Sequence, residues 1–78
     1  MSKYLLRPSI TKGKLLGIGL DVRNNPRWFT ALLSVPFEIR DLQIRKWRGG
    51  LSASGAVLSD HPDLPKWRIP VPYLKEVL

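Results

Sequence analysis

The clearest hydrophobic pattern in the chain is the alternation over residues 66–73, where every second side chain is large and apolar. Because successive side chains of a β-strand point to opposite faces, the apolar ones should contact a core together. The apolar side chains are those of Trp67, Ile69, Val71 and Tyr73, whereas the outward-facing positions hold Lys66, Arg68, Pro70 and Pro72. A proline donates no hydrogen bond to a neighbouring strand, so the pattern predicts a strand at the edge of a sheet.

A second alternation covers residues 15–22, and its apolar positions are Leu16, Ile18, Leu20 and Val22. It predicts another strand, and the turn-forming residues 11–14 predict a hairpin that joins it to a short first strand over residues 4–8. Gly17 and Gly19 fall on the opposite face of this expected strand. Because they have no side chains, another backbone, an aromatic ring or a ligand could approach closely there.

Residues 25–35 have the pattern of a short helix. Asn25 can cap free backbone amides, and Pro26 suits the first helical position. Trp28 and Leu32 would share one face of the helix. Pro36 would end it, because the residue before a proline avoids the helical region. A strand over the same residues is the alternative.

The apolar positions change phase between residues 37 and 47, from Phe37 and Ile39 to Leu42 and Ile44. A change of phase by one residue moves the apolar side chains to the other face of a sheet. The sequence therefore predicts a β-bulge or a tight turn near residues 40–41.

The remaining segments complete the expected fold. Gly49 and Gly50 end an element, residues 51–59 form a weak strand pattern, residues 60–65 form a loop, and residues 74–78 suit a closing helical turn. Together the segments predict a mainly β (α+β) fold, a small barrel-like or rolled antiparallel sheet of four or five short strands with one short helix. Residues 69–74 loosely resemble the closing strand and turn of SH3-like barrels, a likeness that assigns no functional residue.

The composition describes a single small folded domain, residues 1–78. The hydrophobic fraction is 44%, and three tryptophans are many for 78 residues, so the chain is expected to fold. The core of so short a chain is marginal, which favours a homo-oligomer, a larger complex or a nucleic acid as an additional source of stability. The chain has no cysteine, so it has no disulfide or thiolate metal site, and it suits a reducing compartment such as the cytoplasm.

The charge points to an acidic partner. Thirteen lysines and arginines against six acidic residues give a net charge of +7. Nucleic acid is the commonest partner of such a protein, followed by an anionic membrane surface and an acidic protein surface. A charge that serves only solubility is the alternative. No apolar stretch reaches the roughly 20 residues of a membrane span.

Each tryptophan has at least one cation beside it, and Trp47 and Trp67 have a cation on both sides. In a strand, the ring could be buried in the core with its neighbouring cations in solvent on the other face. An exposed ring could instead stack on a base while the cations neutralise phosphates. The second interpretation assigns a nucleic-acid-binding surface to Arg23, Arg27, Arg40, Arg45, Lys46, Trp47, Arg48, Lys66, Trp67 and Arg68.

Catalysis has little support in the sequence. His61 lies between Asp60 and Asp63 and could act as an acid or base or bind a metal weakly, but aspartate and proline are also ordinary loop residues. No nucleophile stands at a recognisable spacing from a base, and we expect no enzyme activity, cofactor or metal.

The sequence favours a non-enzymatic nucleic-acid-binding protein, with DNA and RNA both open. The alternative is a small interaction or inhibitor protein, of the kind that phages and plasmids use as regulators, that docks on an acidic partner or joins an assembly.

Overall fold

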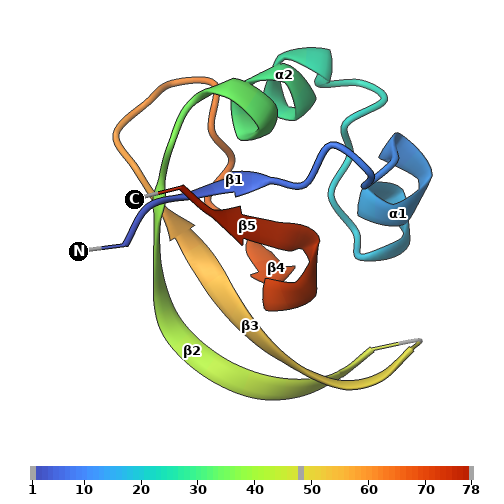
Figure 1. Cartoon of the computed structure of the whole chain (residues 1–78). Coiled ribbons are helices and arrows are strands. Elements are labelled where there is room, and N and C mark those ends of the chain that lie inside the picture. Colours follow the sequence, from blue (N-terminus) through green and yellow to red (C-terminus); the bar gives the residue numbers. More distant parts are fainter. Residues whose placement is uncertain (1, 48, 78) are drawn as a thin grey trace.

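The computed structural model describes residues 2–47 and 49–77, which form a small, compact α+β protein (Figure 1). The elements in chain order are the strand β1 (Tyr4–Leu6), the helices α1 (Lys12–Gly17) and α2 (Pro26–Ser34), the strands β2 (Glu38–Trp47), β3 (Gly50–Leu58) and β4 (Arg68–Pro70), the 3-10 turn η1 (Val71–Tyr73) and the strand β5 (Leu74–Glu76). Within these residues, no helix has the length and apolarity needed to cross a membrane.

The strands form two antiparallel sheets. One contains β1 and β5, and the other has the order β2-β3-β4. A single bridge between Tyr4 and Phe37 connects β1 to the residue before β2. In the described part of the chain the two sheets do not close into a barrel, so the expected antiparallel strands are confirmed and full barrel closure is not. Figure 1 shows β2 and β3 as a long curved hairpin that passes below β4 and β5 and ends on the side of α1.

The core lies between the two sheets and the helices. Residues from every layer are buried in it, among them Leu6, Leu15, Leu32, Phe37, Val57 and Ile69. Burial of this apolar surface is the main stabilising term of the fold. The outer half of the hairpin contributes almost nothing to the core, because residues 41–46 are all exposed.

The short first strand expected over residues 4–8 is confirmed as β1, but the strand expected over residues 15–22 and the hairpin that would join the two are wrong. Residues 12–17 form α1 instead, and Thr11 accepts a hydrogen bond from the backbone amide of Lys14 at 3.3 Å in the manner of a helix cap. Of the expected apolar face, Leu20 and Val22 are buried in the loop that follows, and Leu15 joins them in the core. β1 pairs with β5 rather than with this segment, so tertiary packing overrides the local alternation.

The helix expected after Asn25 is confirmed as α2. Pro26 occupies its first turn, but the Asn25 side chain does not cap it. The Asn25 amide instead donates to the backbone carbonyl of Asp21 at 2.9 Å, and the Asp21 carboxylate accepts from the backbone and side chain of Asn24. These hydrogen bonds from Asn24 stabilise the charged carboxylate and lower the pKa of Asp21.

The expected edge strand over residues 66–73 is shorter than the pattern suggested. Only Arg68–Pro70 are a strand, and β4 does lie at the edge of its sheet. Residues 71–73 turn into η1 because two prolines restrict the backbone there. The closing helical turn expected over residues 74–78 is wrong, since Leu74–Glu76 form β5 and pair with β1; Leu78 lies outside the described residues.

The irregularity expected near residues 40–41 is confirmed as a shift in the pairing of β2 with β3 between Arg40 and Gln43. Asp41 has a φ of 54°, a left-handed conformation that aspartate tolerates better than most residues. The weak pattern over residues 51–59 underestimated β3, which runs from Gly50 to Leu58 and forms the centre of the larger sheet.

Candidate nucleic-acid interface

A hollow of about 420 Å³ lies where β2 faces the chain segment that enters β4. Ile18, at the end of α1, closes one side of it. The other residues that line it all belong to the surface expected from the sequence: Arg45, Lys46, Trp47, Lys66, Trp67 and Arg68. Two Trp-centred segments about twenty residues apart in the chain therefore meet at one place, and none of the lining residues is acidic.

Trp67 is 41% exposed, so it is not the core residue that the alternation suggested. Its indole Nε1 donates to the carbonyl oxygen of Ile18 at 3.3 Å. Gly19 lies beside the ring, with a φ of 90°, and a Cβ built on Gly19 would lie 3.2 Å from Trp67 Cζ2. The close approach of an aromatic ring to a glycine of this segment was expected, although the glycine lies in a loop and not in a strand. Trp67 is thus held at its indole nitrogen while much of its surface remains open to solvent.

Trp47 is half-buried at the end of β2. The guanidinium carbon of Arg45 lies 5.7 Å from the centre of its ring, within the range of a cation–π contact. Its indole nitrogen is buried and, within the described structure, has no hydrogen-bond partner. Trp47 also lines a second hollow, of about 390 Å³, between the hairpin and α1, so its ring separates two depressions of the surface.

Arg68 borders the hollow, but its positive charge is paired with Asp41 and stabilises the fold. Its side chain is 16% exposed, and its guanidinium pairs with the Asp41 carboxylate at 2.5 Å. The same group donates to the carbonyl of Asp41 at 2.7 Å and to that of Ser54 at 3.2 Å. Arg68 therefore joins β4 to the bulge of β2 across β3 and has little charge left for a ligand.

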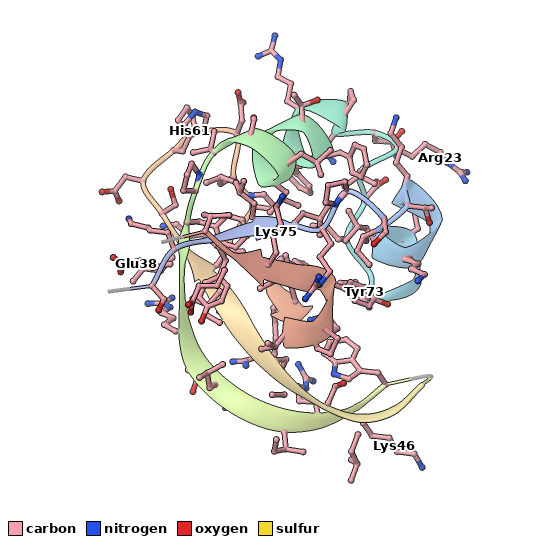
Figure 2. The ribbon with its side chains drawn as sticks, viewed as in Figure 1. Arg23, Glu38, Lys46, His61, Tyr73 and Lys75 are labelled. Carbon is pink, nitrogen blue, oxygen red and sulfur yellow. The ribbon has the colours of Figure 1, made fainter. Side chains whose placement is uncertain are left out.

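Lys46 stands at the rim of the hollow. It lies opposite Leu51 in the hairpin, and Figure 2 shows its side chain pointing away from the rest of the molecule. Arg45 lies opposite Ser52 and therefore on the other face of the hairpin, the face that carries Trp47. Arg45 and Lys66, both exposed, are the cations best placed to meet a ligand in the hollow beside Trp67.

The structure does not bring Arg23, Arg27 or Arg40 to this hollow. Arg23 precedes α2, and Figure 2 shows it far from Lys46. Arg27 lines a separate hollow with His61 and Asp63. Arg40 is exposed on β2 before the bulge, opposite Ala56. Arg48 lies outside the described residues.

Sequence reasoning missed the contribution of Ile18 and its loop. The signal was present in Gly19, whose lack of a side chain admits the ring of Trp67. The sequence analysis placed Gly19 in a strand and not in a loop, because the alternation of residues 15–22 resembles that of a strand.

His61 belongs to a turn. Its Nδ1 accepts a hydrogen bond from the backbone amide of Asp63 at 3.1 Å, and its own amide donates to Ser59 Oγ at 3.1 Å. Among the residues that the structure describes, no three histidine, aspartate or glutamate side chains gather where they could hold a metal ion. These contacts fit the loop interpretation of the segment better than a catalytic one.

Comparisons with protein-family models, with curated proteins and with solved structures find no match for this chain.

Proposed function

We propose that this protein binds nucleic acid without catalysing a reaction, and that it does so at the hollow between β2 and the segment before β4. One observation carries the proposal: Arg45, Lys66 and the exposed Trp67 surround a single hollow that no acidic residue lines. The net charge of +7 supports it, because a basic protein attracts a polyanion from a distance.

The residues would divide the work. Arg45 and Lys66 would contact phosphates on the two sides of the hollow, and Lys46 would add a contact at its rim. Trp67 would stack on a base, a contact that contributes roughly 1–3 kcal/mol per base in other proteins. Trp47 would support Arg45 through the cation–π contact, and Arg68 would keep β4 and the bulge in place. We place this activity in the cytoplasm, in line with the cysteine-free composition.

Two or three phosphate contacts predict a moderate dependence on salt. For a single strand, the logarithm of the binding constant should fall with the logarithm of the salt concentration with a slope of about −1.4 to −2.1. A base stacked on Trp67 would persist as salt rises, so part of the affinity should remain at physiological ionic strength.

The first experiment is a titration of nucleic-acid-free protein with single-stranded DNA, duplex DNA and RNA oligonucleotides at low and physiological salt, followed by tryptophan fluorescence. Quenching that survives physiological salt and depends on Trp67 is the expected result. Binding that disappears equally for every oligonucleotide as salt rises would reduce the charge to a general surface property and contradict the proposal.

A matched pair of variants localises the site. Arg45→Ala and Arg23→Ala each remove one positive charge from an exposed arginine, but only Arg45 lines the hollow. Arg45→Ala should weaken binding by roughly tenfold, the upper range of one charged contact, whereas Arg23→Ala should have little effect. Equal losses in both variants would mean that only net charge matters.

A further inference from the structure

The strand β2 has a free edge that the rest of the described chain does not use. The sheet order β2-β3-β4 places β2 at one side, and Figure 1 shows no strand along its outer edge. The bridge from β1 to this part of the chain is at Phe37, the residue before β2. Alternate residues of such an edge direct backbone N–H and C=O groups outward, where another chain can pair with them.

The bulge protects only one end of this edge. It interrupts the pairing between Arg40 and Gln43, and Arg68 occupies the backbone carbonyl of Asp41. Beyond it, residues 43–47 pair with β3 in unbroken register. The open stretch is therefore residues 42–47, the outer half of the hairpin.

The outer face of this stretch is apolar. Leu42 is 64% exposed, Ile44 is 70% exposed and Leu51 is 74% exposed. Ile44 lies opposite Ala53 and Lys46 lies opposite Leu51, so these side chains share one face. Leu42 joins them, because a Cβ on Gly55, two residues after Ala53, would lie 3.3 Å from Leu42 Cδ2. We call Leu42, Ile44 and Leu51 the outer strip.

Charge selects the occupant of this edge. No acidic residue occurs between Asp41 and Asp60, while Arg45 and Lys46 both lie on the open stretch. A second copy of the chain would bring the same cations against themselves, which disfavours pairing of β2 with β2. A strand whose apolar side chains lie beside the outer strip, and whose alternate carboxylates lie on the other face beside Arg45, satisfies both the apolar surface and the charge, and Lys46 adds positive charge along the edge.

We propose that residues 42–47 bind an extended, acidic segment of a partner protein, which adds as a further strand to the edge of β2. Backbone hydrogen bonds supply the pairing, and the outer strip and the two cations select the sequence. This surface shares Arg45, Lys46 and Trp47 with the hollow, but the outer strip does not line the hollow, so the proposal stands whether or not the protein binds nucleic acid.

The test uses a synthetic peptide that alternates glutamate and valine and is long enough to span residues 42–47. One control peptide has the same composition with its glutamates and valines in separate blocks, and another has lysine in place of glutamate. Binding is followed through the backbone amide NMR signals of the whole protein and through amide hydrogen exchange.

The alternating acidic peptide should shift the signals of residues 42–47 and slow the exchange of their outward amides by about tenfold or more at saturation. The double variant Ile44→Ser with Leu51→Ser should weaken binding at least about fivefold, because it removes apolar contacts worth roughly 1 kcal/mol or more. Leu58→Ser, at an exposed leucine outside the outer strip, should leave binding unchanged. If the double variant unfolds, the test is repeated with Ile44→Thr alone, because threonine retains a high strand propensity.

Four results would overturn the proposal. The block peptide could bind as well as the alternating one, which would mean that net charge alone, and not pairing as a strand, causes the binding. The lysine peptide could bind equally, which would remove the role of Arg45 and Lys46. The signals that shift could belong to residues outside the hairpin, or none could shift at millimolar peptide, which would show that the edge is closed.

Discussion

The two ends of the β2–β3 hairpin differ sharply although they share the same two strands. At the base, Ile39 lies opposite Val57, which is buried in the core, and Arg68 joins the bulge to β4. At the outer end, Leu42, Ile44 and Leu51 are exposed, and the charges are all positive. The base is fixed by packing and by a paired charge, whereas the outer end contributes little to the core. A segment that stability does not constrain is free to carry binding residues.

The largest expected effect lies at the base. Phe37→Ala removes a ring that is almost fully buried where β1 meets the start of the hairpin, and should lower the free energy of unfolding by about 3–5 kcal/mol. Leu51→Ala at the outer end should change it by less than about 0.5 kcal/mol. Urea denaturation followed by circular dichroism measures both. A large loss at Leu51 would mean that the outer end is buried in solution.

The next effect separates two arginines near the same hollow. Arg68→Ala removes the hydrogen bonds that its guanidinium donates to the Asp41 carboxylate and to the backbone carbonyls of Asp41 and Ser54, so it should cost about 1.5–3 kcal/mol of stability. Arg45→Ala should cost less than about 0.5 kcal/mol, because Arg45 is exposed. Urea denaturation of both variants would therefore show a division between an arginine of the fold and an arginine of the surface. If both variants were equally stable, the Arg68 network would have no structural role.

A smaller effect is expected at Gly55, which lies opposite the bulge. A Cβ at this position would lie 3.0 Å from Ile39 Cβ and 3.1 Å from Ile39 Cδ1. Gly55→Ala should therefore destabilise the protein by about 1–2 kcal/mol through overpacking of the base. Gly17→Ala is the control, because nothing lies within 4 Å of the added Cβ there. Thermal unfolding of the two variants compares them, and an unchanged midpoint for Gly55→Ala would show that the hairpin can shift at its base.

The hairpin also shows what the sequence could predict. The phase change at residues 37–44 predicted the bulge, because a slip of one residue reverses the faces of a strand wherever the strands are paired. Six of the ten residues of the expected Trp and cation surface line the hollow, and their role in binding nucleic acid stays a prediction. The exposure of Trp67 was not predictable, because it depends on Gly19 and Ile18, which lie almost fifty residues earlier in the chain. The alternation of residues 15–22 failed for the same reason: partners distant in the chain decided whether a local pattern became helix or strand.

An effect no larger than that of Gly55→Ala is expected when one substitution is applied to both ends of the same strand. Ile39→Thr should destabilise the protein by roughly 1–2 kcal/mol, because Ile39 packs against the core and threonine replaces part of its apolar surface with a polar hydroxyl. Ile44→Thr should change stability by less than about 0.5 kcal/mol, since Ile44 is 70% exposed and threonine also favours strands. A clear loss for Ile44→Thr that grows with protein concentration would mean that the outer strip is covered by a second copy. Such a result would make a second copy of the chain, and not an acidic partner segment, the occupant of this surface, because the like charges of Arg45 and Lys46 would then be tolerated at the interface.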